Sequence, residues 1–238
     1  MTPGDDAPAA GAPTVAVRVW DGPTRLFHWT LALLVAANVA TGHFDSMLGA
    51  NTLDWHRRFG YALLGLVAFR LVWGFAGGTH ARFASFLKGP RAVLGYAKAL
   101  ASGAHPVTAG HNPMGGWSVV ALLASVATQA ITGLFIVQED YGIAGPLSRF
   151  VSGATSDRMN SIHEANGWVL CALAGLHLAA IVMHTVKWRE DLVGAMLSGV
   201  KRLPAGREAE AGRPAGWAAF VVALSLGAAV VAGLVALG

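Results

Sequence analysis

Five long apolar segments divide this chain, and they constrain its fold more than any other feature. A helix needs about 20 predominantly apolar residues to cross the hydrocarbon core of a bilayer. Five windows meet or approach that length, the first two being short: 26–44, 59–76, 117–137, 165–186 and 215–237. The alternating ten-residue segments that mark a membrane β-barrel do not occur in the sequence. We therefore predict an all-α integral membrane protein.

Composition supports lipid as the solvent. Charged residues make up 13% of the chain, about half the share typical of a soluble domain. The 17 Lys and Arg residues lie mostly between the apolar segments and form no continuous basic face, which argues against nucleic acid as a partner. The single cysteine, Cys171, excludes an internal disulfide, a four-thiolate zinc site and a cysteine-ligated iron–sulfur cluster.

The segments divide the chain into four parts. Residues 1–17 are rich in Pro, Ala and Gly, contain no Lys or Arg, and are expected to form a disordered tail without a cleavable signal. Residues 18–202 are expected to form a four-helix transmembrane bundle, because bundles build cofactor sites from facing side chains. A polar linker over 203–214 then leads to an additional transmembrane helix over 215–238.

Basic residues predict the orientation. Helices over the five windows would place twelve Lys and Arg on one side: Arg18, Arg25, Arg82, Lys88, Arg91, Lys98, Lys187, Arg189, Lys201, Arg202, Arg207 and Arg213. The other side would hold four: Arg57, Arg58, Arg149 and Arg158. The positive-inside rule therefore places the N-terminus in the cytoplasm.

Histidines in the apolar segments are the main functional signal, because ionisable side chains are costly at membrane depth. His163 and His177 are 14 residues apart in the fourth window, which puts them within about 40° of one helix face and roughly 21 Å apart along its axis. They are too far apart to share one metal ion. Each can instead supply one axial bond to a separate haem.

Depth indicates their partners. The first helix would begin on the inner side and the second on the outer side, so we predict that His28 pairs with His177 and His56 with His163. Two haem b groups, each with two histidine ligands, would result. Helix tilt would have to absorb a depth mismatch of about 10 Å in the inner pair. His43 is an alternative to His56 in the outer pair.

These residues stand in strings that resemble the bacterial cytochrome b561 and nickel-iron hydrogenase b-type cytochrome family. The strings are Val19 to Trp29, Thr41-Gly42, Trp55 to Tyr61, Phe69 to Gly74, Gly110 to Pro113, and His163 with His177. The resemblance covers about residues 17–202. It implies the same four ligands, a bacterial inner (cytoplasmic) membrane location, a quinone pool, and a c-type cytochrome or hydrogenase-like redox subunit as partner. The family core has four spans, so the fifth helix is a departure.

Three arginines are candidate partners of the haem propionates. Arg70 lies 14 residues after His56, on nearly the same helix face and close to the inner leaflet, while Arg57 or Arg58 would serve the outer haem. The competing interpretation of Arg70 is a side chain that snorkels from a helix end.

Thr128, Gln129 and Thr132 in the third window can bond a quinone head group or a neighbouring helix, and the second interpretation is favoured. His43 and His184 are interpreted chiefly as packing or hydrogen-bonding groups. His111, in the turn before the third window, is a further candidate for a quinone or propionate site.

The sequence thus predicts an electron-transfer cytochrome subunit that relays electrons between quinone and a redox partner, as part of a quinone-linked oxidoreductase and compatible with a homo-oligomer. Two alternatives stay open. One is a transporter or proton-relay protein with a histidine-lined bundle, and the other is a membrane anchor for a redox enzyme with structural histidines. Absorption bands of haem b discriminate the cytochrome from both.

Overall fold

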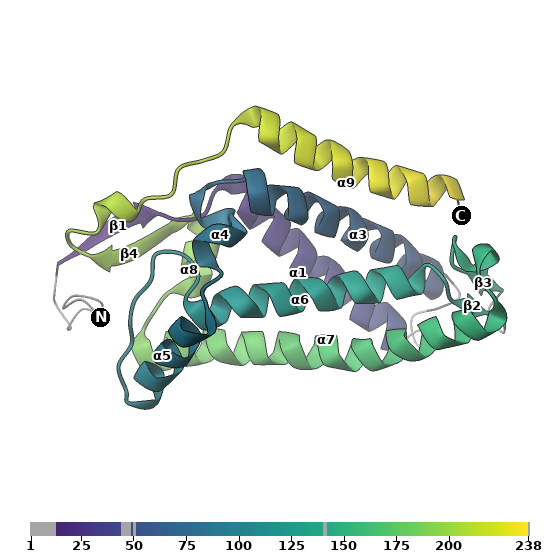
Figure 1. Cartoon of the computed structure of the whole chain (residues 1–238), viewed down its shortest axis with the longest axis horizontal. Coiled ribbons are helices and arrows are strands. Elements are labelled where there is room, and N and C mark those ends of the chain that lie inside the picture. The colour runs from purple at the N-terminus through teal and green to yellow at the C-terminus, as the bar shows by residue number, and fades with distance from the viewer. Residues whose placement is uncertain (1–12, 44–48, 50, 140–141, 238) are drawn as a thin grey trace. The chain divides into compact units, whose positions relative to one another are not determined.

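The computed structural model describes residues 13–43, 49, 51–139 and 142–237. Four of its helices are long and apolar enough to cross a membrane. These are α3 (Thr52–Ala76), α6 (Pro113–Gly133), α7 (Gly153–Trp188) and α9 (Trp217–Leu237) (Figure 1). The helical membrane architecture expected from the sequence is confirmed.

The first predicted span differs from the other four. It forms a helix, α1 (Gly22–His43), whose 22 residues would extend about 33 Å, long enough for a bilayer core. It is nevertheless not among the helices that are both long enough and apolar enough to cross a membrane. Polar residues such as His28 and Asn38 dilute its apolar run, so its passage through the membrane stays a prediction.

Apolar side chains on the long helices face outward. On α7, Leu176, Leu178 and Val186 are 68%, 61% and 74% exposed. Water would penalise such a surface, whereas lipid tails solvate it. The exposed apolar side chains and the low share of charged residues thus indicate the same thing, that lipid surrounds these helices.

The residues cluster into two compact units. The first comprises residues 1–26, 73–120 and 175–220, and the second comprises residues 27–72, 121–174 and 221–238. The boundaries fall inside long helices, so each of these helices contributes residues to both units.

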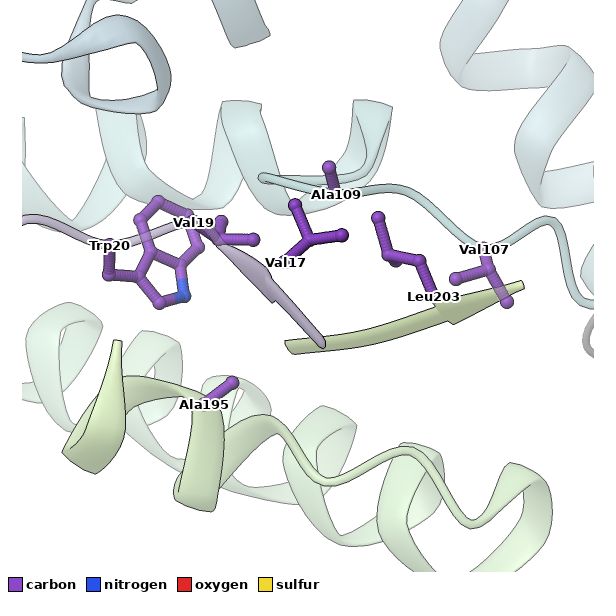
Figure 2. Close-up of a cluster of buried hydrophobic side chains, with 7 residues drawn as sticks. All are labelled: Val17, Val19, Trp20, Val107, Ala109, Ala195 and Leu203. Atoms are coloured by element: carbon purple, nitrogen blue, oxygen red, sulfur yellow. The ribbon is translucent and has the colours of Figure 1, made fainter. Parts of the chain in front are cut away.

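A two-stranded antiparallel sheet organises the first unit. Strand β1 (Thr14–Arg18) pairs with β4 (Val200–Pro204), with Thr14 opposite Pro204 and Arg18 opposite Val200. Inward-facing side chains of both strands join a buried apolar cluster, shown in Figure 2. Its members are Val17, Val19, Trp20, Val107, Ala109, Ala195 and Leu203.

Short helices complete the first unit: η1 (Thr79–Ala81), α4 (Phe83–Phe86), α5 (Pro90–Ala101), α8 (Leu192–Ser198) and η4 (Glu208–Glu210). The Asp191 side chain caps α8 by accepting a bond from the Gly194 amide. Gly199 ends α8 at φ 83°, and a side chain there would meet the Trp20 carbonyl at 2.6 Å. Glycine is required here, because the chain must turn directly from α8 into β4.

The sheet corrects two expectations. The tail predicted to be disordered over 1–17 includes β1 from Thr14 onward, while residues 1–12 lie outside the described part of the chain. The predicted linker over 203–214 begins inside β4 and includes η4. Both regions gain order from a partner that lies some 190 residues away in sequence, which local composition does not reveal.

The second unit packs its helices through apolar residues and through one close approach of backbones. Leu63, Val67, Val126 and Leu170 form a buried cluster from α3, α6 and α7. Elsewhere in this unit, a Cβ on Gly227 of α9 would lie 2.7 Å from the carbonyl oxygen of Gly65 in α3. Small residues allow membrane helices to approach this closely. The predicted fifth helix is therefore packed against α3.

A short hairpin and a 3₁₀ helix are the remaining elements of the second unit. A hairpin joins β2 (Val137–Gln138) to β3 (Ile143–Ala144), followed by η3 (Ser148–Phe150). Leu234 near the end of α9 packs with Tyr61 of α3 and with Leu134. Gly227 and Leu234 of α9 thus both contact residues of α3.

We expect Gly227→Val to destabilise the packing of α9 on α3 by about 1–3 kcal/mol, because the added side chain overfills the contact with Gly65. The measurement is thermal unfolding of the detergent-solubilised protein, followed by circular dichroism. Gly233→Val is the matched control on the same helix, since nothing lies within 4 Å of its Cβ position. Equal unfolding temperatures for the two variants would contradict the contact.

Candidate functional site

Two histidines predicted to act together meet in the second unit. His56 lies near the start of α3 and His163 lies in the first half of α7. Their ring centroids are 6.1 Å apart and their ring planes form an angle of 71°. The structure therefore brings together the outer pair expected from the sequence, two histidines that lie more than a hundred residues apart along the chain.

The Nδ1 atom of His56 is held by α1. It lies 3.1 Å from the Asn38 carbonyl oxygen and 3.2 Å from Thr41 Oγ1. The Thr41 hydroxyl donates to the Ala37 carbonyl at 2.8 Å, so its oxygen is left to accept. Both contacts therefore favour the tautomer with a proton on Nδ1, which leaves the Nε2 lone pair available for a ligand.

His163 has an equivalent partner on α6. Its Nδ1 lies 3.1 Å from Thr132 Oγ1, and the Thr132 hydroxyl donates to the Thr128 carbonyl at 2.7 Å. The threonine oxygen again accepts from Nδ1–H, and Nε2 is again the unprotonated nitrogen. A hydrogen bond of this kind fixes the orientation of a metal-binding imidazole and raises its basicity.

A glycine follows each of these threonines. A Cβ on Gly42 would lie 3.0 Å from Cε1 of His56, and one on Gly133 would lie 3.3 Å from Cε1 of His163. Larger residues would push against the imidazoles. Each histidine ring thus packs against a Thr-Gly dipeptide. The threonine hydroxyl orients the ring, and the glycine leaves space for it.

The separation of the two rings suits axial ligation of one metal ion. A metal–imidazole bond is about 2.0–2.1 Å long and the nitrogen lies ~1.1 Å from its ring centre, so two axial imidazoles have centroids about 6 Å apart. The observed 6.1 Å fits this value. His56 and His163 therefore fit the iron of a haem with two histidine ligands.

The alternative outer ligand, His43, is placed differently. Its Nδ1 lies 3.2 Å from the Val39 carbonyl of its own helix, and its ring packs against Trp168 at 5.2 Å. The ring that meets His163 is that of His56. The structure thus favours His56 over His43.

The predicted inner pair is divided between the two units. His28 lies in the part of α1 that belongs to the second unit, and His177 lies in the part of α7 that belongs to the first. Both side chains are half-buried. Their pairing stays a prediction from sequence.

The three candidate arginines have different surroundings. Arg70 is buried within α3, with 3% of its surface exposed. Arg57 forms an ion pair with Asp54 at 3.2 Å, and Arg58 lies over the Trp55 ring at 5.3 Å. Arg70 thus differs from a snorkelling side chain, whose charged head would reach the surface.

The sequence did not reveal how the imidazoles are oriented. Thr132 was expected to bond a neighbouring helix, and its contact with His163 on α7 confirms that expectation. Gln129 also reaches α7, where its Oε1 accepts from the Asn166 amide at 2.7 Å. The orienting roles of Asn38 and Thr41 were not anticipated, although the recurrence of Thr-Gly at 41–42 and 132–133 was a readable signal.

The sequence matches the prokaryotic cytochrome b561 family over residues 19–199. Among curated proteins, it is 26% identical to a probable Ni/Fe-hydrogenase B-type cytochrome subunit of Rhodobacter capsulatus, over 77% of this chain and 80% of that protein. It is 25% identical to the protein of the same name from Rhizobium leguminosarum bv. viciae, over 81% of this chain and 91% of that protein.

We expect Thr132→Val to weaken haem retention at His163 by about 10–100-fold, because the variant keeps the shape of the side chain and removes the acceptor of Nδ1–H. Haem content after dilution in detergent is the measurement. Thr132→Ser should restore retention, and Thr128→Val on the same helix is the control. Retention by Thr132→Val equal to that of the unmodified protein would show that the hydroxyl does not orient the ring.

Proposed function

The chain belongs to the prokaryotic cytochrome b561 family, and from this premise and the geometry of its histidines we propose that it is a dihaem cytochrome that relays electrons between a quinone pool and a redox partner protein. The b-type cytochromes of this family bind haem b and transfer electrons in membranes. The proposal adds the number of haems, their ligands and the partners.

The meeting of His56 with His163 is the observation that carries the proposal. Two half-buried imidazoles, each with its Nδ1 atom hydrogen-bonded to a threonine hydroxyl and its Nε2 atom left to bind a metal ion, have ring centroids 6.1 Å apart, a distance that suits two ligands of one iron. An isolated structural histidine needs only one such arrangement. Two matched ones in a single unit support an axial ligand pair.

We assign the second haem to His28 and His177. This assignment rests on the 14-residue spacing of His163 and His177, which places the two α7 histidines at different depths of one helix. Two centres at different depths shorten each electron transfer step to less than the roughly 30 Å of the bilayer core.

The protein's residues tune and hold the cofactor. Haem b supplies a one-electron iron couple when it is bound. A haem held by two histidines would favour electron transfer over oxygen binding. Buried Arg70 is suited to a propionate, because a guanidinium pairs well with a carboxylate. Arg57 and Arg58 would serve the outer haem, Arg57 in exchange for its contact with Asp54.

The partners follow from the relatives and from topology. The relatives are named as hydrogenase cytochrome subunits, so a hydrogenase-like or c-type cytochrome subunit is the proposed docking partner, with quinone as the second redox partner. Membership of the family supports an inner-membrane location, and the distribution of basic residues supports a cytoplasmic N-terminus.

The purified protein is expected to show the absorption bands of haem b and to contain two haems per chain. His163→Ala should remove one haem and His177→Ala the other, because each variant deletes one axial ligand of a different pair. Pyridine haemochrome absorbance per chain is the measurement, with His43→Gln as the control that should keep both haems. Loss of haem from neither ligand variant would refute the ligand assignment, and a colourless protein would favour the transporter or anchor interpretations.

A further inference from the structure

A second cluster of ligand atoms lies in the first unit, separate from the haem histidines. His184 Nδ1 is 2.7 Å from Glu190 Oε2, and His105 Nε2 is 3.0 Å from the same oxygen. The two ring nitrogens are 3.2 Å from each other. Two imidazole nitrogens and one carboxylate oxygen thus converge on a single point, from the end of α7, the segment that follows it, and the segment between α5 and α6.

A strained turn directs the carboxylate to this point. Arg189, which follows the last residue of α7, has φ 53°, in the left-handed region that costs a residue with a side chain roughly 1–2 kcal/mol. The turn reverses the chain, so that the Glu190 amide donates to the His184 carbonyl at 3.1 Å. Non-glycine residues persist in this conformation where the surrounding structure determines it, and such positions concentrate at ligand sites.

The cluster is shielded from solvent. The side chains of His105 and His184 are 3% and 6% exposed, and that of Glu190 is 11% exposed. Trp188 forms one wall, stacked on the His105 ring at 4.7 Å and packed edge-on against the His184 ring at 4.9 Å. A ligand bound here would exchange little with bulk water.

The protonation states suit a cation. Burial opposes ionisation of Glu190, but hydrogen bonds from His184 and Lys201 and the Lys201 charge lower its pKa to about 2, so the carboxylate is ionised at neutral pH. The His184 Nδ1 atom donates to this carboxylate without an ion and would give up its proton on binding one, as metal ligation requires. Burial lowers the pKa of His105, which leaves this imidazole neutral. Its Nδ1 is buried and has no hydrogen-bond partner within the described residues, so that atom can carry the ring proton when Nε2 binds a ligand.

Lys201 moderates the site without blocking it. Its ammonium lies 2.5 Å from Glu190 Oε1 and 2.7 Å from the Thr108 carbonyl. The lysine thus occupies one carboxylate oxygen while the other, Oε2, faces the imidazoles. Its positive charge weakens the attraction of the cluster for a second cation.

We propose that His105, His184 and Glu190 form a binding site for a divalent transition-metal ion. Zinc best matches two imidazole nitrogens and one carboxylate oxygen, with a water molecule as fourth ligand. Ligand atoms about 2.0–2.1 Å from such an ion lie roughly 3.0–3.4 Å from one another, so the cluster needs only a small expansion to accept it. No assigned haem ligand takes part.

The test uses the untagged full-length protein in detergent, stripped with a chelator and dialysed against graded concentrations of Zn²⁺ alone. Zinc and iron per chain are measured together by mass spectrometry. We expect one saturable zinc per chain. His105→Ala, His184→Ala and Glu190→Gln should each weaken its binding by at least about 100-fold, since even groups that only support a ligand contribute 10–100-fold.

Two further variants make the result decisive. Lys201→Met should tighten zinc binding about tenfold or more, because it removes a neighbouring positive charge, whereas loss of a purely structural ion pair would give no gain. His43→Gln, which removes an exposed histidine of the other unit, should leave zinc binding unchanged. Iron content and circular dichroism report whether each variant is folded. Absence of saturable zinc, survival of binding in Glu190→Gln, or unchanged affinity in Lys201→Met would overturn the proposal.

Discussion

The desolvation of imidazole is the constraint on which the candidate site depends. A neutral histidine in an apolar bundle must find an acceptor for its one N–H and a use for its one lone pair, since an unmet polar group in such surroundings is costly. In His56 and His163, a threonine and the neighbouring helix backbone satisfy the first requirement. Because Nδ1 carries the proton, the lone pair lies on Nε2, and this nitrogen is the one that can bind a metal ion. The same hydrogen bond that lets the ring lie within the bundle also determines which nitrogen can bind iron.

The sequence predicts the spans and the outer histidine pair, because both follow from local periodicity and length. The apolar windows correspond to helices α1, α3, α6, α7 and α9, and the order of inner and outer helix ends leads to His56 and His163. The role of the two Thr-Gly dipeptides was harder to interpret, since a threonine in a membrane helix usually donates its hydroxyl to a backbone carbonyl of the same helix. Thr132 makes that bond as well, through its hydrogen, while its oxygen serves the histidine.

Features that join distant segments could not be read from the sequence. The pairing of β1 with β4 needs two short strands whose alternation is unremarkable and whose register emerges only in three dimensions. His105, His184 and Glu190 come from segments that appear unrelated, and Glu190 is drawn toward His184 by a left-handed Arg189 that no propensity predicts. Long-range contacts of this type depend on tertiary packing, which overrides local preference.

The β1–β4 pairing has a consequence for biogenesis. About 180 residues, including helices α1, α3, α6 and α7, separate the two strands. At synthesis rates of about 5–20 residues per second, β1 leaves the ribosome roughly 10–40 s before its partner exists. The spans must therefore enter the bilayer while this N-terminal segment waits single-stranded, and its closure onto β4 is a late step, completed only when nearly the whole polypeptide has been translated.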